Sequence, residues 1–113
     1  HEVSEISGFL KKNGISISSA YIFCIKPFNR KKLLKIIKNK TKIVTLEEQH
    51  IDGGIGSIIS EIIAEENLNI SVKRYGIRDF YSHRYGDRNW LRKTYKLDCK
   101  HLKNNILNWV KKK

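Results

Sequence analysis

The sequence alternates short apolar runs, rich in β-branched and aromatic residues, with longer stretches whose apolar residues recur at helical spacing. Runs at residues 20–25, 42–46 and 70–77 have the length of strands, and Lys26-Pro27 closes the first. Helical stripes lie between them and at both ends of the chain. This alternation predicts an α/β protein, a three-layer α/β/α sandwich with a mostly parallel sheet.

Capping residues set the expected limits of the helices. The first stripe ends at residues 13–14, Asn-Gly, and Asn29 is placed to cap the second helix. A broad apolar stripe over residues 55–63 predicts the most buried helix. Asp87 and Asp98 precede two more apolar stripes, so we expect each of them to cap a helix.

Length and composition indicate one compact domain over residues 1–113, because 113 residues with 40% hydrophobic content suffice for a single core. The 23 Lys and Arg against 11 Asp and Glu give a net charge of +12, which fits either a solvated lysine coat or a face that attracts anions. Cys24 and Cys99 form no CxxC motif, which favours a reduced, cytoplasmic protein. No apolar run reaches the roughly 18 residues of a membrane span, so we expect no membrane partner.

The stretch "VTLEEQHIDGGIGS" leads from the second predicted strand into the most apolar helix. Gly53, Gly54 and Gly56 would allow backbone N–H groups to converge on an anion at the start of that helix. However, the spacing is that of neither a dinucleotide fingerprint nor a P-loop, and three acids stand just before the glycines (Glu47, Glu48 and Asp52). A structural turn and an anion or partner-contact site therefore both remain open.

Candidate catalytic groups are incomplete. Glu47 and Glu48 lie near His50 and invite an acid/base interpretation, but no nucleophile or metal-ligand spacing completes a set. We therefore predict no catalytic or metal-binding residue in this chain. The loop after residue 77 interleaves aromatic and basic residues, as single-stranded nucleic-acid binders and protein interfaces both do, and it supplies a possible basic contact loop (Arg78, Arg84 and Arg88).

The order of the motifs resembles a known family. "GFLKKNGISISSAYIFCIKPFN", "KIVTLEEQHIDGGIGSIISEIIAE", "SVKRYGIRDFY" and "GDRNWLRKTYKLD" follow one another as in the C-terminal domain of transketolase and related thiamine-diphosphate enzymes. The likeness is greatest to transketolases that are split into two chains. It covers nearly all of residues 1–110 and rests on the ordered set of motifs.

The resemblance implies an assembly role. Domains of this kind bind neither thiamine diphosphate nor Mg²⁺, which the other domains of the full enzyme hold, and the enzyme transfers a two-carbon ketol unit between sugar phosphates. The chain alone is therefore expected to be inactive. Its expected partners are the N-terminal and pyrimidine-type domains or subunit, in a homodimer or a heterotetramer. The resemblance assigns Glu47, His50, Gly53, Gly54, Gly56 and Ser57 to an interface turn, which is also where an effector would be sought.

One departure from the family concerns the first strand. The family domain normally begins with a strand of the "VTIIATG" kind, so we expect residues upstream of His1, or a partner, to supply it to a chain otherwise truncated at its N-terminus. Two alternatives keep the fold and change the reaction: a 2-oxo-acid dehydrogenase β subunit or deoxyxylulose-phosphate synthase. A third is a basic nucleic-acid-binding module, which the resemblance makes less favoured.

Overall fold

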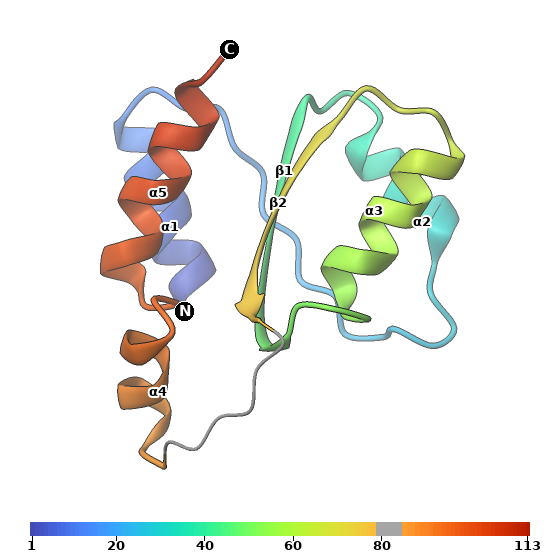
Figure 1. The fold of residues 1–113 in the computed structure, drawn as a ribbon. Coiled ribbons are helices and arrows are strands. Elements are labelled where there is room, and N and C mark those ends of the chain that lie inside the picture. The colour runs from blue at the N-terminus through green and yellow to red at the C-terminus, as the bar shows by residue number, and fades with distance from the viewer. Residues whose placement is uncertain (79–84) are drawn as a thin grey trace. The chain divides into compact units, whose positions relative to one another are not determined.

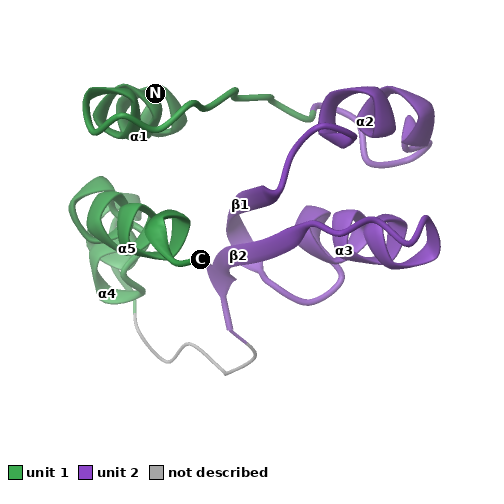
Figure 2. Cartoon of the chain, turned by 90° about the horizontal axis from the view of Figure 1, so that it is seen from above, with its two compact units in different colours: residues 1–22, 83–113 green, residues 23–82 purple. Residues whose placement is uncertain are grey.

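A computed structural model describes residues 1–78 and 85–113 of the chain. It divides into two compact units, residues 1–22 with 83–113 (unit 1) and residues 23–82 (unit 2) (Figure 2). Helices and a parallel sheet confirm the predicted α/β class. The elements, in chain order, are α1 (Glu2–Lys12), α2 (Arg30–Ile37), β1 (Lys42–His50), α3 (Ile55–Glu65), β2 (Ser71–Ile77), α4 (Arg88–Thr94) and α5 (Cys99–Lys111) (Figure 1).

The sheet of unit 2 pairs β1 with β2 in parallel. The register is regular from Lys42 opposite Ser71 to Leu46 opposite Tyr75. The next pair is His50 with Ile77, so β1 uses four residues where β2 uses two, and the ladder is irregular between them. Such irregularities bend a strand and redirect its side chains. The bend falls at the point where β1 approaches the glycines.

The core of unit 2 lies between α2, α3 and one face of the sheet. Leu33 and Ile37 of α2 pack with three isoleucines of α3, which are Ile59, Ile62 and Ile63. Ile43 of β1 and Val72 of β2 pack against this cluster. The isoleucines are the broad stripe predicted from the sequence, and α3 is accordingly well buried. Its burial fixes the position of its N-terminus at the end of β1.

An exposed ion-pair network joins the start of α2 to the end of α3. Arg30 donates to Glu65 at 2.5 Å and to Glu66 at 2.7 Å. These hydrogen bonds, led by that to Glu66, raise the pKa of the Arg30 guanidinium. The Arg30 side chain therefore links the two helices by ion pairs beside their apolar contact.

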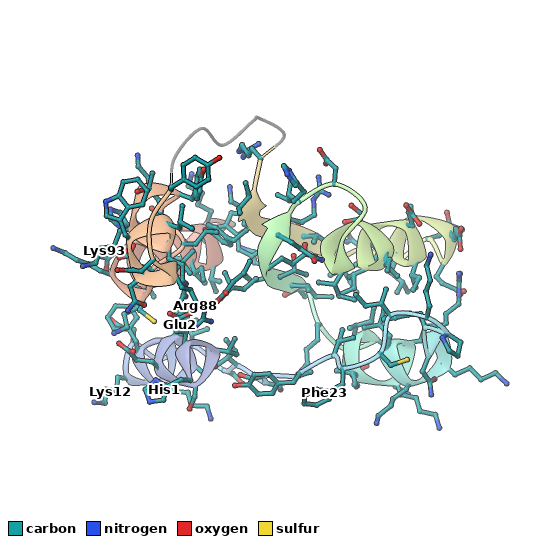
Figure 3. The ribbon with its side chains drawn as sticks, turned by 90° about the horizontal axis from the view of Figure 1, so that it is seen from below. His1, Glu2, Lys12, Phe23, Arg88 and Lys93 are labelled. Atoms are coloured by element: carbon teal, nitrogen blue, oxygen red, sulfur yellow. The ribbon has the colours of Figure 1, made fainter. Side chains whose placement is uncertain are left out.

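Unit 1 is a helical unit in which α1 lies alongside α5 (Figure 1). Leu10 and Leu102 are its most deeply buried side chains, at 1% and 0% exposure. The buried Arg92 of α4 forms an ion pair with the partly exposed Glu2, which is labelled in Figure 3, and donates to the carbonyl of Leu97 at 3.1 Å. Of the helices that the structure describes, none has both the length and the apolar character needed to cross a membrane.

The predicted helix caps are found at the expected positions, with one difference in bonding. Asn29 accepts from the N–H of Lys32 at 2.9 Å, and Asp87 accepts from that of Trp90 at 2.8 Å, as Asx caps do. Asp98 stands at the N-cap of α5 but makes no capping bond, because its carboxylate pairs with His101 instead. The cap position was thus predicted correctly and its hydrogen bond was not.

The strand predicted at residues 20–25 is wrong. These residues form no strand and are all exposed, with Tyr21 at 55% and Phe23, labelled in Figure 3, at 95%. β-propensity reflects how a side chain fits a sheet that is already paired, and does not hold an isolated strand together. In the described part of the chain β1 pairs with β2 alone, and residues 20–25 are not paired with either strand.

Candidate functional site

The glycine turn, residues 51–57, begins where β1 ends and continues into the first turn of α3, and a buried carboxylate holds it from beneath. Glu47 of β1 is 6% exposed. It accepts from the N–H of Ile55 at 2.5 Å and from the N–H of Gly56 at 3.2 Å. These are N–H groups that a helix start leaves unpaired, and the helix dipole favours negative charge there. Glu47 therefore caps α3 from the neighbouring strand, in place of Gly54, which has no side chain to do so.

Two glycines are required because other side chains take their space. A Cβ at Gly54 would collide with the carboxylate of Glu47, lying 2.8 Å from its Cδ. A Cβ at Gly56 would lie 2.7 Å from Oγ1 of Thr45 and 2.8 Å from Cδ of Arg74. A larger residue at either position would therefore force these side chains to shift.

Gly53 is required for a different reason. Its φ is +74°, in the left-handed region that side chains disfavour, and nothing lies within 4 Å of where its Cβ would be. The turn reverses direction at this residue. Gly53 therefore permits the left-handed backbone conformation of the turn, and Gly54 and Gly56 permit the close contact between α3 and the sheet.

Ser57 and Arg74 tie the turn to itself. The hydroxyl of Ser57 donates to the carbonyl of Ile51 at 3.2 Å and accepts from the N–H of Gly53 at 3.1 Å. Arg74 Nη1 donates to the same hydroxyl at 3.0 Å and to the carbonyl of Ile51 at 3.3 Å. A hydroxyl offers one donor and two acceptor positions, so the serine has no bonding capacity left. It is a bracing residue with no free hydroxyl to act as a nucleophile.

Sequence reasoning missed Arg74. It lies on β2 two residues after Val72, which packs on the core beneath α3, so strand alternation places it on the same face. A charged residue on an otherwise apolar strand face, opposite a glycine-rich turn, was the signal available. Its guanidinium reaches the turn because Gly56 leaves room for the methylenes.

The exposed rim of the turn is polar. Glu48, His50, Asp52 and Gly53 are exposed, while Glu47 and Ser57 are turned inward to the bonds described above. Within residues 1–78 and 85–113, no group of three His, Cys, Asp or Glu side chains could hold a metal ion. Because the buried carboxylate beneath the turn is already bonded to α3, these residues do not fit the diphosphate and Mg²⁺ of thiamine diphosphate.

The predicted site residues are brought together only in part. The six turn residues (Glu47, His50, Gly53, Gly54, Gly56 and Ser57) lie within one strand-turn-helix segment. In the predicted basic contact loop, Arg78 follows β2 in unit 2 and Arg88 begins α4 in unit 1. Arg84 lies outside the described residues.

Unit 2 is an α/β unit, because two parallel strands are connected through a buried helix. The glycine turn lies at the carboxyl end of the first strand, which is the edge where open α/β sheets bind ligands. Residues 1–102 match the family profile "Transketolase, C-terminal domain". The chain therefore belongs to the transketolase C-terminal domain family.

Curated relatives agree with this family. The chain is 33% identical over 99 residues to a subunit of the "Apulose-4-phosphate transketolase" of Actinobacillus succinogenes, covering 88% of this chain and 32% of that protein. It is 37% identical over 103 residues to "Putative transketolase C-terminal section" of Methanocaldococcus jannaschii, covering 91% and 31%. A "1-deoxy-D-xylulose-5-phosphate synthase" of Syntrophus aciditrophicus is 39% identical over 74 residues, covering 65% and 11%. The chain thus spans about a third or less of these relatives.

A solved structure shares the fold. "Split gene transketolase, inactive beta4 tetramer" superposes with a TM-score of 0.73 at 24% identity, covering 95% of this chain and 34% of that one. The predicted likeness to a transketolase C-terminal domain is confirmed by these comparisons.

Proposed function

We propose that this chain is the C-terminal assembly part of a transketolase-type enzyme that transfers a two-carbon ketol unit between sugar phosphates. The observation that carries the enzyme class is the match of residues 1–102 to the transketolase C-terminal domain family. The assembly role is supported by the glycine turn, where Glu47 and Ser57 are bonded internally. Ser57 has no bonding capacity left, and Glu47 is buried with both carboxylate oxygens bonded to α3, so both residues hold the shape of the turn. Thiamine diphosphate and Mg²⁺ belong to other parts of the assembly, where the cofactor supplies the carbanion chemistry.

The exposed rim of the glycine turn is the proposed contact with the rest of the enzyme. His50, Asp52 and Gly53 are exposed there, on a backbone held by Arg74 from below. A rigid turn binds at low entropic cost because it is already ordered before contact. A small anionic effector is the second use of this turn, but it would have to displace Glu47 from the N–H groups of α3.

Reconstitution tests the proposal. The chain is mixed with the thiamine-diphosphate-binding subunit of the same source, the complex is measured by sedimentation, and ketol transfer is assayed with aldose phosphates. We expect no transfer from the chain alone, and a larger, active complex after mixing. Replacing His50 and Asp52 by Ala should weaken the complex while the chain melts like the wild type, because both side chains are exposed. Failure of the wild-type chain to join the subunit would contradict the assembly role.

Deoxyxylulose-phosphate synthase activity is the second candidate, favoured by the 39% identity over 74 residues to such a synthase. The reconstituted complex separates the two, because a synthase condenses a 2-oxo acid with an aldose phosphate and releases CO₂. Consumption of 2-oxo acids without ketol transfer would assign the chain to the synthase or to a 2-oxo-acid dehydrogenase.

A phosphate-dependent rise in melting temperature at constant ionic strength would support the effector use of the turn.

A further inference from the structure

The outward side of α2 and its C-cap carries four lysines and one isoleucine, which together we call the α2 lysine face (Lys31, Lys32, Lys35, Ile36 and Lys38). All five side chains are exposed. No Asp or Glu occurs anywhere in residues 26–42. Among the described residues, none of these four lysines takes part in an ion pair, and Arg30 is the α2 cation that pairs with Glu65 and Glu66. The cationic face is therefore not neutralised within the part of the chain that the structure describes.

This face works against the stability of its own helix. The first turn of α2 has no acidic residue and carries Arg30, Lys31 and Lys32 at the positive end of the helix dipole. Lys31 and Lys35 are four residues apart, so they are neighbours of like charge along the helix. The helix dipole therefore favours acids at residues 30–32, whereas Lys35 and Lys38 lie at the C-terminal end of α2, where cations are favourable. A sequence that departs from the local preference on an exposed face points to a contact outside the fold.

An apolar side chain among the charges narrows the kind of partner. Ile36 is 44% exposed, and Lys32, four residues before it, is its neighbour along the helix. Nucleic acid fits this face poorly. Its phosphate backbone makes no favourable contact with an exposed isoleucine, and the face has no aromatic ring on which a base could stack. An interface between proteins, in contrast, combines an apolar centre with a charged rim.

The opposite side of α2 rules out insertion into a lipid surface. Leu33 and Ile37 form its apolar stripe, and both are buried in the core against α3, at 7% and 4% exposure. Membrane-surface helices bury that stripe among lipid chains. Here the stripe is already occupied, and only the lysine side is available.

We propose that the α2 lysine face is a docking surface for an acidic protein surface, one whose carboxylates surround a small apolar spot that receives Ile36. The proposal goes beyond the assembly role, since it requires neither the thiamine-diphosphate-binding subunit nor the glycine turn. Long-range attraction brings the partner to the lysines, and the isoleucine makes the contact specific.

Peptide binding tests this chemistry directly. The intact chain is titrated by fluorescence anisotropy with a helical peptide that has glutamates around one central leucine, and with the same peptide carrying serine at that position. We expect the leucine peptide to bind more tightly than the serine peptide. The variant I36S should abolish that difference while leaving the affinity for the serine peptide unchanged. Reversing two lysines in K31E/K35E should weaken both peptides about tenfold or more.

A charge-matched variant provides the control. K111E/K113E changes the net charge by the same amount at the exposed C-terminal end. It should bind the peptides like the wild type, and circular dichroism verifies that each variant is folded. The proposal is overturned if K111E/K113E weakens binding as much as K31E/K35E, or if I36S leaves the leucine preference unchanged. It is also overturned if a DNA duplex of equal charge, or phosphatidylserine vesicles, binds more tightly than the leucine peptide and loses that binding in K31E/K35E.

Discussion

At the scale of single residues, Glu47 should contribute more to the free energy of unfolding than its neighbours in the sequence. Its two hydrogen bonds to α3 are charge-assisted and buried. Replacing it by Ala leaves the N–H groups of Ile55 and Gly56 without that acceptor, which should cost about 2–3 kcal/mol in the free energy of unfolding. Urea denaturation measures this loss. Asp52→Ala is the matched control: its side chain is exposed, so it should change stability by less than about 0.5 kcal/mol. Equal losses in the two variants would contradict the capping role.

The glycines give a second prediction at the residue scale. Gly54→Ala places a methyl group against the buried carboxylate of Glu47, and overpacking of this kind costs about 1–3 kcal/mol. Gly53→Ala meets no atom but keeps φ at +74°, so it should cost about 1 kcal/mol. Gly8→Ala, inside α1 with open space around it, should be neutral or stabilising by up to about 1 kcal/mol. Thermal melts of the three variants should rank them in that order, and a Gly54 variant as stable as the Gly8 variant would show that the contact is relieved at no cost.

At the scale of elements, α1 and α5 are coupled through an ion pair that depends on pH. Lys103 Nζ donates to Glu5 at 2.5 Å and lies 5.8 Å from the centre of the Phe9 ring. This hydrogen bond lowers the pKa of the Glu5 carboxyl below 4.5 and raises the pKa of Lys103 above 10.5. The stabilisation is therefore complete between about pH 4.5 and 10.5, and is lost as pH falls through the lowered value or rises through the raised one.

The expected result is that Glu5→Gln melts below the wild type at neutral pH and that the two melting temperatures converge in acid. Glu61→Gln is the control, because Glu61 is an exposed glutamate of α3 with no ion pair in the described part of the chain. It should follow the wild type at every pH. A difference between wild type and Glu5→Gln that persists well below pH 4.5 would assign the effect to packing instead of charge.

At the scale of the whole molecule, residues 20–25 are the segment whose environment should change on assembly. Phe23 and Tyr21 are exposed although the run has strong β-propensity. We expect the amides of Ile22, Cys24 and Ile25 to exchange rapidly with solvent in the isolated chain and to become protected in the reconstituted enzyme, as a strand gains a neighbour. The amides of residues 43–46, which lie in β1, should be protected in both. Rapid exchange of Ile22, Cys24 and Ile25 within the active complex would contradict this expectation.

Local signals along the chain were sufficient to predict the helices, β1 and β2, and the fold class. Helical stripes and turn residues act over a few positions, and caps such as Asn29 and Asp87 act within three residues. The family was also readable, because the motifs keep their order along the chain. The glycine turn was placed correctly at the start of α3, since apolar strand, acids, glycines and apolar helix follow one another directly.

The roles of the turn residues, in contrast, depend on tertiary contacts. From the sequence, Glu47 could be a catalytic acid, a charge that repels phosphate or a helix cap. It is a cap because α3 begins eight residues later, where the N–H of Ile55 meets the Glu47 carboxylate. Arg74 joins the turn from a strand that lies 17 residues beyond Ser57, a distance that no local pattern spans. The conformation of residues 20–25 is likewise a tertiary matter, because a strand exists only where another strand completes its hydrogen bonds.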